Sequence, residues 1–462
     1  MSSDSNSWRL ELEASTVTRM EGGHAPEPVR VPTLTVLHHP DLRRVGETAP
    51  LGALHSGRCA ELSRLEPRFA PPRGGEPRPL VDSHLSRRPL GLRPAGDEGV
   101  TIDVADSSVS LVVDGRPISS SCDLSRRDLD TGVTLRLADR VVLFLHRTDP
   151  TPSRVDELGL IGESLAIDSL RRDILRAARL DAPVLIRGET GSGKELVAEA
   201  LHRGSPRRRG PFVAVNMAAI TPSLAAAEIF GTVSGAYTGA SARPGLWRRA
   251  DGGSLLLDEL GEAPAELQAL LLRALETSEI QPVGADRPSK VDVRIFAATD
   301  ADLEQLTEAG DFRAPLIHRL AGFSIRVPAL RHRRDDIPRL LHHFLRQELQ
   351  TLGALDRLRP TPRGQRPWLD AMLAERLVRY GWPGNVRQLR NVARHLAAEG
   401  CTSGVLDGRA VERLLTDDGA SSPEAASADV RSAGGDGGRR EWRGMPSRIS
   451  EDVLRQTLRE HE

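Results

Sequence analysis

The chain is 462 residues long, and its 63 Lys and Arg residues almost balance its 64 Asp and Glu residues, for a net charge of −1. Hydrophobic residues make up 39% and charged residues 27%, as in soluble globular proteins. At roughly 100–200 residues per domain, this length predicts two to four domains. The balanced charge excludes a protein that binds polyanions through its overall field, and leaves room only for local basic patches.

The three cysteines, Cys59, Cys122 and Cys401, form neither a Cys-x-x-Cys motif nor a disulfide framework. The N-terminus is polar and lacks the apolar core of a signal peptide. The most apolar run, residues 141–145, is far shorter than the ~20 residues of a membrane helix. We therefore expect a cytoplasmic protein that makes no contact with membranes.

Strand-like patterns dominate the N-terminal third of the chain. Residues 1–30 are polar and are predicted to be loose. In residues 31–148 short apolar segments alternate with polar residues, and 141–145 is continuously apolar. Asp114-Gly115 between two short apolar segments predicts a β-hairpin. We infer a small β-sandwich, followed by a Pro-rich linker at 149–159.

The pattern then changes to strands that alternate with helices. Over residues 160–327 this alternation predicts a parallel α/β sheet. Helical periodicity over 328–416 predicts a smaller helical subdomain. Residues 417–446 contain few large apolar side chains and are predicted to be a disordered linker. Residues 447–462 begin like a helix.

A glycine-rich segment follows an apolar strand and opens a helix, which predicts a phosphate-binding loop. Its glycines let backbone N–H groups close around phosphates at a helix N-terminus, and Lys194 would reach the β- and γ-phosphates of ATP. Only two of the 63 basic residues are lysines, and Lys194 is one of them. The predicted ATP-binding residues of this loop are Gly188, Glu189, Thr190, Gly191, Ser192, Gly193, Lys194 and Glu195.

Two carboxylates end a second apolar strand, at Asp258 and Glu259. Asp258 suits Mg²⁺ or its water shell, and Glu259 suits a base that polarises the attacking water. Position 195 is Glu rather than the Ser or Thr that usually helps to hold Mg²⁺, so the metal would depend more on other ligands or water.

Residues 160–396 resemble the AAA+ domain of bacterial sigma-54 activators, the enhancer-binding proteins. The phosphate loop with Glu after its lysine is similar to that family, and so is the segment Glu228-Ile229-Phe230-Gly231. More specific is a later loop, in which Tyr237 replaces the family's phenylalanine. The resemblance implies that this loop contacts sigma-54 through Gly235, Ala236, Tyr237, Thr238, Gly239 and Ala240.

The resemblance also assigns residues to the catalytic cycle. Asn216 corresponds to a switch asparagine that restrains Glu259. Arg313 and Arg319 correspond to arginine fingers that reach the γ-phosphate bound by a neighbouring subunit. Pro315 stands between them where the family has Asp, and proline restricts the helix there.

Two sensor positions are implied as well. Arg387, in the segment Trp382-Pro383-Gly384-Asn385-Val386-Arg387, is similar to the second sensor, which reads the nucleotide from the lid. Asp300 stands at the first sensor, where the family has Asn. A carboxylate there would repel the γ-phosphate unless the metal or an arginine compensates, so we expect slower hydrolysis.

The N-terminal region resembles an FHA (forkhead-associated) domain, a reader of phosphothreonine. The implied phosphopeptide residues are Arg64, Ser86 and Arg87, whose guanidinium and hydroxyl groups suit a phosphate dianion. Ser63 and Pro89 depart from the family's Gly and His. The alternative is a structural β-domain that does not read phosphate.

Sigma-54 activators usually end in a Fis-like helix-turn-helix, and residues 447–462 resemble its first helix only. No recognition helix follows that could enter a major groove. We therefore expect that this chain does not bind a specific DNA site alone.

Together these features predict a sigma-54-dependent transcription regulator. A ring, which the resemblance implies to be a hexamer, would hydrolyse ATP and remodel the closed complex of sigma-54 and RNA polymerase. Two alternatives stay open: a truncated regulator that titrates partners without binding DNA, and an AAA+ ATPase with another client, such as a chelatase or protease subunit.

Overall fold

The structure is a computed structural model, and it describes residues 30–72, 74–104, 107–149, 157–236, 241–360 and 367–403, with Leu406, Val411 and Leu415. The chain separates into two compact units, residues 1–415 and 416–462. All described residues belong to the first unit. The predictions for 417–446 and 447–462, and for 1–30 except its last residue, lie outside the described residues.

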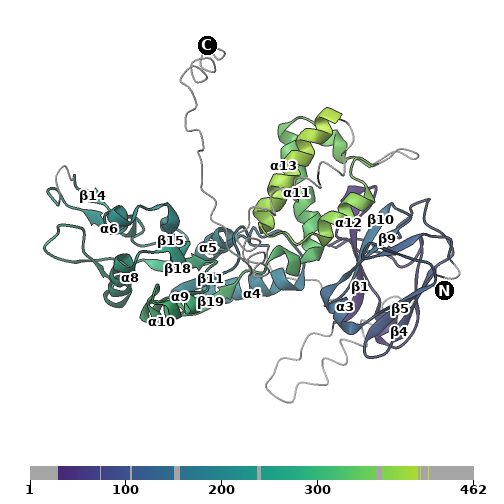
Figure 1. Ribbon diagram of the computed structural model, residues 1–462, viewed down its shortest axis with the longest axis horizontal. Helices are drawn as coiled ribbons and strands as arrows, with labels where there is room; N and C mark the ends of the chain where they lie inside the picture. The colour runs from purple at the N-terminus through teal and green to yellow at the C-terminus, as the bar shows by residue number, and fades with distance from the viewer. Residues whose placement is uncertain are drawn as a thin grey trace, which may run out of the picture. The chain divides into compact units, whose positions relative to one another are not determined.

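Residues 31–148 form two antiparallel sheets around one apolar core (Figure 1). The first sheet has the order β2-β1-β10-β9-β6-β7 and the second β3-β4-β5-β8. The strands are β1 (Val31–His38), β2 (Thr48–Pro50), β3 (Ala60–Leu62), β4 (Leu90–Ala95), β5 (Gly99–Asp103), β6 (Leu111–Val113), β7 (Arg116–Ile118), β8 (Ser121–Leu124), β9 (Val133–Leu137) and β10 (Val141–Thr148). Two short helices lie between them, α2 (Gly52–His55) and α3 (Arg126–Thr131).

The predicted hairpin at Asp114-Gly115 is confirmed. These residues join β6 to β7, and their φ angles are 43° and 78°. Positive φ at both turn residues matches the right-handed twist of the strands, and Asp-Gly is a favoured pair for such a turn.

A five-stranded parallel sheet forms the centre of the chain, with the order β12-β15-β18-β11-β19. Its strands are β11 (Val184–Arg187), β12 (Phe212–Asn216), β15 (Ser254–Asp258), β18 (Arg294–Thr299) and β19 (Phe323–Arg326). Two short hairpins accompany it, β13 (Gly231–Thr232) with β14 (Arg243–Pro244) and β16 (Glu279–Ile280) with β17 (Ser289–Lys290).

Helices cover both faces of this sheet (Figure 1), so its central strands carry apolar side chains on both faces. In β15, Leu256 joins the core of α4 (Leu165–Ala178) and α5 (Lys194–Arg203). Leu255 and Leu257 join the opposite core. That core also contains side chains of α6 (Ala225–Phe230), α7 (Leu246–Arg249), α8 (Ala265–Thr277), α9 (Leu303–Ala309) and α10 (Ala314–Leu320). The predicted parallel α/β architecture is confirmed.

The predicted helical subdomain is confirmed as three main helices, α11 (Ile337–Thr351), α12 (Ala371–Arg379) and α13 (Asn385–Ser403). We call it the lid. Their apolar faces form one core, which includes the buried Trp382. Within the described residues no helix is both long and apolar enough to cross a membrane.

Strand β10 is covered on both of its faces. Val141, Leu143 and Leu145 belong to the core between the two N-terminal sheets. Val142 and Phe144 belong instead to the core of the lid. Because successive side chains of a strand point to opposite faces, the apolar run noted in the sequence reflects burial from two sides.

His38 ends β1 in this double-sided environment. Its side chain is 1% exposed, and its Nε2 atom has no hydrogen-bond partner within the described part of the chain. Burial, together with the charges of His39 and Arg140, lowers the pKa of His38 from 6.5 to about 3. The folded chain therefore holds this imidazole neutral, whereas the unfolded chain protonates it below pH 6.5.

We predict that this histidine makes the fold sensitive to acid. The unfolded state binds the extra proton, so stability falls as the pH falls below 6.5, by roughly 2 kcal/mol from His38 at pH 5. Denaturant unfolding of wild type and His38→Leu at pH 7.5 and pH 5 measures this. The substitution should reduce the loss, while His55→Gln, at an exposed histidine, should not. An equal loss in wild type and His38→Leu would contradict the assignment.

Candidate nucleotide-binding site

The phosphate loop joins β11 to α5, as the sequence predicts. Gly191 and Gly193 have φ angles of 73° and 108°, a left-handed conformation that glycine adopts without strain. Gly193 is the N-cap of α5 and carries no capping side chain. The first N–H groups of the helix are thus left for a ligand, and the helix dipole favours an anion there.

The loop also carries side-chain donors that suit such an anion. Lys194 is 6% exposed, and its Nζ donates to the carbonyl of Gly188 at 2.9 Å. The hydroxyl of Ser192 is buried and has no hydrogen-bond partner among the described residues. Glu195 is exposed in the first turn of α5.

The two predicted carboxylates lie at the end of β15. In the sheet, β18 lies between β15 and β11, the strand that precedes the phosphate loop. Asp258 is the last residue of the strand, and its Oδ1 accepts the N–H of Glu259 at 3.0 Å. Glu259 has φ 52° and ψ 48°. A left-handed conformation is uncommon for a residue other than glycine and is often found at functional sites.

Asp300 links Glu259, the predicted base, to the phosphate loop. It follows β18, accepts a short hydrogen bond from the hydroxyl of Thr190, and shares a hydrogen bond with Glu259. Burial, this bond, and the charges of Asp300 and Asp258 raise the pKa of Glu259 from 4.5 to about 7, against the opposing charge of Lys194. Burial also disfavours ionised Asp300, but the two hydrogen bonds and Lys194 lower its pKa overall. Below about pH 7 the pair of carboxylates therefore holds a proton that it shares.

Asn216 ends β12 and lies opposite Asp258 in the sheet register. Its side-chain oxygen accepts the N–H of Ala218 at 2.9 Å. The structure thus places this residue at the same sheet edge as the carboxylates, with its side chain engaged in a local turn.

The lid holds the phosphate loop through hydrogen bonds. The carbonyl of Gly191 accepts the N–H groups of Val386 and Arg387 at 3.0 and 3.3 Å. Asn385, which is 0% exposed, donates to the carboxylate of Glu189 at 3.1 Å and to the carbonyl of Thr190 at 3.2 Å. The predicted sensor residue Arg387 thus lies directly against the loop.

Two arginines that were not predicted from the sequence also hold the phosphate loop. Arg331 forms a two-pronged ion pair with Glu189, with one N–O distance of 2.7 Å. Arg333 donates to the carbonyl of Ser192 at 3.2 Å. In a chain so rich in arginine, no local signal separates these two from solvated arginines; Asn385, in contrast, lies inside a motif that the sequence analysis quoted.

Both predicted finger residues are exposed and lie at the two ends of α10. The backbone N–H of Arg313 donates to Gln268 at 3.0 Å, and the guanidinium of Arg319 donates to the carbonyl of Leu275 at 3.2 and 3.3 Å. Pro315 occupies the first turn of α10, where the missing N–H costs nothing. The helix therefore accommodates the proline.

The predicted sigma-54 loop connects β13 to β14, which pair as a short hairpin. Gly235 has a φ of 82°, and the N–H of Ala236 donates to the carbonyl of Val233 at 3.3 Å. The other four predicted contact residues, 237–240, lie outside the described residues.

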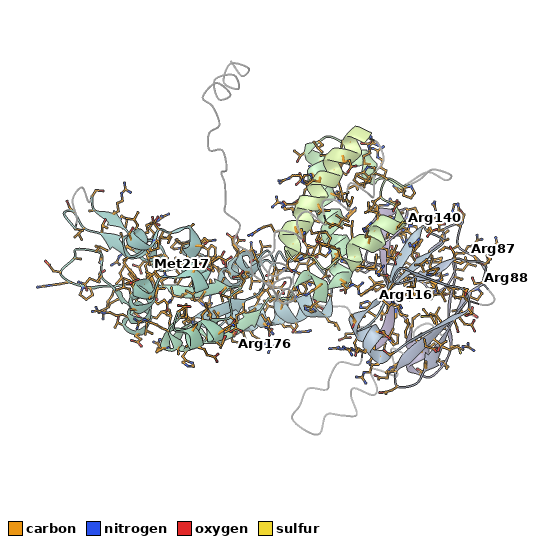
Figure 2. The ribbon with its side chains drawn as sticks, in the orientation of Figure 1. Arg87, Arg88, Arg116, Arg140, Arg176 and Met217 are labelled. Carbon is orange, nitrogen blue, oxygen red and sulfur yellow. The ribbon has the colours of Figure 1, made fainter. Side chains whose placement is uncertain are left out.

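The three predicted phosphopeptide residues come from neighbouring loops of the N-terminal sheets. The N–H of Arg64 donates to the carbonyl of Ser86 at 3.3 Å. The hydroxyl of Ser86 contacts the hydroxyl of Ser108 at 3.2 Å. Arg87 is exposed, and Figure 2 shows it beside Arg88 at the margin of this domain. The structure thus brings these residues together.

Comparison with known proteins agrees with this geometry. Residues 160–326 match the Sigma-54 interaction domain, and residues 331–428 match the AAA+ ATPase lid domain. The DNA-binding transcriptional regulator NtrC of Escherichia coli is 48% identical over 238 residues, which are 51% of this chain and 49% of that protein. The anaerobic nitric oxide reductase transcription regulator NorR of Aeromonas salmonicida is 48% identical over 252 residues, 54% of this chain and 47% of that protein.

A crystal structure of NtrX from Brucella abortus in complex with ADP is 40% identical, and the match covers 53% of this chain and 52% of that chain with a TM-score of 0.47. The chain spans about half the length of the two curated relatives above. The fold and the site define the central region as an AAA+ ATPase module with its lid. More particularly, its α/β part matches the Sigma-54 interaction domain and is similar to part of NtrC.

We predict that Asp300 sets the pH dependence of this site. The predicted base, Glu259, would accept a proton only when ionised, so hydrolysis of ATP should rise with pH around 7. Asp300→Asn removes a charge that raises the pKa of Glu259, so the rising part of the pH–rate profile should move to lower pH. Rates of ATP hydrolysis between pH 5.5 and 8.5 measure the shift.

The matched control is Asp302→Asn, which loses the same charge at the N-cap of α9, where Asn also caps well. Its profile should coincide with that of the wild type. An unshifted profile for Asp300→Asn would show that the two carboxylates are not coupled.

Proposed function

We propose that this chain is a sigma-54-dependent transcription regulator that hydrolyses ATP in an oligomeric ring to remodel the closed complex of sigma-54 polymerase. The observation that carries the proposal is the phosphate loop held by a lid, in a region that matches the Sigma-54 interaction domain. The same region carries a hairpin loop whose sequence is similar to the sigma-54-binding loop.

The residues of the site fit ATP and Mg²⁺. The N–H groups at the start of α5, the buried hydroxyl of Ser192 and Lys194 are donors that suit phosphate oxygens. No cluster of three or more metal-ligating side chains occurs among the described residues. Mg²⁺ would therefore be held by Asp258 together with water and phosphate oxygens, a common arrangement for this ion. When bound, the ion neutralises phosphate charge.

Glu259 is the general base in this proposal. Its ionised carboxylate orients the attacking water and accepts its proton, and Lys194 stabilises the charge on the phosphate oxygens. Asn216 lies opposite Asp258 in the register of the sheet, and Glu259 is the next residue after Asp258. This position supports its role as a switch.

The arginine fingers act between subunits in this proposal. Arg313 and Arg319 are exposed, and their described hydrogen bonds go to residues of α8 rather than to the phosphate loop. An arginine on an exposed helix end is available to a nucleotide bound by a neighbouring subunit. The site of each subunit would be completed by its neighbour in a ring, which we propose to be a hexamer.

We predict that hydrolysis requires these fingers in trans. Wild-type turnover per subunit should rise steeply with protein concentration. Arg313→Ala should lose at least about 10³-fold of the turnover while it still binds ATP. Lys194→Ala should lose ATP binding but keep its own fingers.

Mixing the two inactive variants makes the test sharper. Sites formed between an Arg313→Ala subunit and the fingers of a Lys194→Ala subunit should hydrolyse ATP. Arg273→Ala, at an exposed arginine of α8, should leave turnover unchanged. Concentration-independent turnover by Arg313→Ala alone would contradict a finger in trans.

The loop at residues 235–240 is the proposed contact with sigma-54. Its glycines and alanines leave one aromatic ring, Tyr237, and one hydroxyl, Thr238, as the groups that a partner can recognise. In the sequence the loop lies between β13 and β14, apart from the phosphate loop at 188–195, so the proposed contact with the partner is separate from the residues of the chemistry.

We predict that Thr238→Ala abolishes binding to sigma-54 while hydrolysis of ATP is retained. Ser241→Ala removes an exposed hydroxyl just outside the motif and should bind normally. A pull-down with sigma-54 and an ATPase assay on the same preparations measure both properties. Retained sigma-54 binding by Thr238→Ala would favour an AAA+ ATPase with another client.

We also propose that the N-terminal sheets are an FHA-like reader of a phosphothreonine protein. The two-sheet sandwich and the closeness of the Arg64 and Ser86 backbones support this proposal. The exposed guanidinium of Arg87 could pair with a phosphate dianion at this edge (Figure 2).

A further inference from the structure

The N-terminal sheets are joined to the lid by a buried carboxylate. Glu375 of α12 is 3% exposed, although no charge partner from the lid contacts it in the described residues. Its Oε2 accepts from Nε of Arg136 at 2.7 Å, and its Oε1 accepts from the N–H of Gly115 at 3.0 Å. The hydroxyl of Thr134 lies 3.2 Å from Oε1 and shares its hydrogen between Glu375 and Asp114. All three donors belong to the N-terminal sheets.

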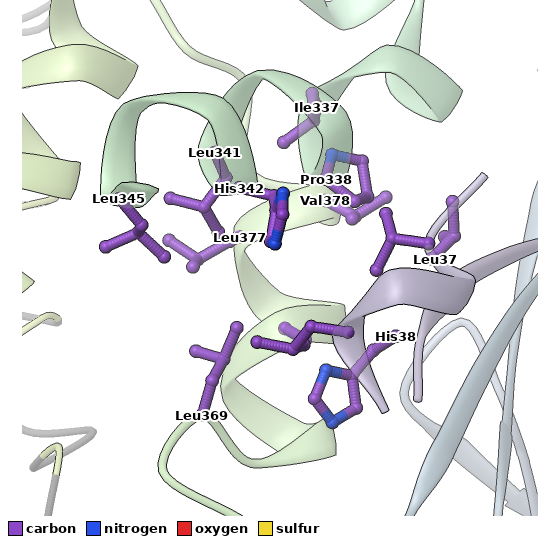
Figure 3. A pocket seen from close by; sticks show the side chains of 13 residues that line it. Leu37, His38, Ile337, Pro338, Leu341, His342, Leu345, Leu369, Leu377 and Val378 are labelled. Carbon is purple, nitrogen blue, oxygen red and sulfur yellow. The ribbon is translucent and has the colours of Figure 1, made fainter. Parts of the chain in front are cut away.

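Apolar packing also joins the N-terminal sheets to the lid. Leu37 of β1, with Val142 and Phe144 of β10, belongs to the same core as Leu341 and Leu377 of the lid. Figure 3 shows Leu37 and His38 opposite side chains of α11 and α12. The cavity that these side chains line is only about 20 Å³, room for about one water molecule. This part of the junction is therefore closely packed, whereas a second cavity of about 410 Å³ lies beside it and is lined by Val45 of the N-terminal region and by Arg339 and His342 of the lid.

Other lid side chains reach the backbone of the sheets. Arg334 donates to the carbonyl of Gly132 at 3.2 Å and lies over the ring of Phe144. Arg339 donates to the carbonyl of Gly46 at 2.9 Å, and a side chain at Gly46 would collide with this guanidinium. Close backbone approaches of this kind are made by tightly fitted surfaces.

The lid carries this junction onward to the phosphate loop. Trp382 donates to the carbonyl of Leu377 at 2.8 Å, which fixes the turn after α12. Asn385, at the other end of that turn, donates to Glu189 and Thr190 of the loop. The turn at residues 382–385 therefore contacts α12, which packs on the N-terminal sheets, at one end, and the phosphate loop at the other end.

We propose that the N-terminal sheets control nucleotide affinity by holding the lid against the phosphate loop, and that Glu375 is the residue that fixes them to the lid. A buried carboxylate must keep its donors, because an unpaired buried charge is strongly destabilising. The junction thus holds as a whole or opens as a whole. A ligand that moves the N-terminal sheets would change the position of Asn385 and, with it, the hold on the loop. This inference rests on the proposed nucleotide site.

The test uses the full chain and a fluorescent ADP analogue. Glu375→Gln keeps the shape but places an amide N–H₂ group against donors on the N-terminal sheets. We expect faster hydrogen exchange of α12 and β9, and a Kd for the analogue raised at least about 5-fold, the lower end of typical coupling between sites. Thr134→Val, which removes only the shared hydrogen bond, should raise the Kd less.

Glu348→Gln is the matched control, because the partner of this lid carboxylate, Arg394, also belongs to the lid. It should leave both exchange at the junction and the Kd unchanged. Faster exchange in Glu375→Gln with an unchanged Kd would overturn the proposal, and so would unchanged exchange. A wild-type chain that fails to bind the analogue would instead refute the nucleotide site itself. Circular dichroism of each variant checks that the fold is kept, and Thr134→Val supplies the test if Glu375→Gln does not fold.

Discussion

A phosphate-binding loop depends on contacts with other segments, because many of its own N–H groups must stay free for the ligand. In this chain other segments hold the loop by its carbonyls and side chains. Arg331 and Asn385 hold Glu189, Val386 and Arg387 hold the carbonyl of Gly191, and Arg333 holds that of Ser192. Asp300 holds Thr190, and the carbonyl of Thr299 in β18 accepts the N–H of Gly188 at 3.2 Å. The other partners named here come from the segment after the central sheet, so the position of the lid affects the geometry of the site.

The same constraint explains the reach of the N-terminal sheets. The lid core is completed on one side by β1 and β10, and Glu375 finds its donors on β9 and in the β6–β7 turn of the same sheet. An N-terminal domain attached only by a linker would affect the nucleotide site only when it collided with it. Here the sheets share a core with the lid, which also contacts the phosphate loop, so a movement of the sheets would be transmitted to the loop through packed side chains.

Local features were predictable from the sequence, and long-range partners were not. The phosphate loop, the strand that ends in Asp258 and Glu259, and the Asp114-Gly115 turn each depend on neighbouring residues, so their patterns indicate them. The roles of Arg331 and Glu375 depend on residues more than a hundred positions away. Nothing in their immediate sequence distinguishes them from solvated side chains.

Two departures from the family pattern acquire physical meaning in the structure. Pro315 lies in the first turn of α10, so the helix forms around it. Asp300 does not stand alone as a repulsive charge, because it accepts hydrogen bonds from Thr190 and Glu259. The continuous apolar run in β10 was visible in the sequence, but only the packing of the lid shows why both faces of that strand are apolar.

The central claim is that nucleotide, lid and N-terminal sheets form one connected system. Amide hydrogen exchange of the full chain with and without ADP tests it most directly. The account predicts that ADP slows exchange in the phosphate loop, at the start of α13, and also in β9, next to the Glu375 ion pair. Protection confined to the phosphate loop, with exchange in α13 and β9 unchanged, would contradict it.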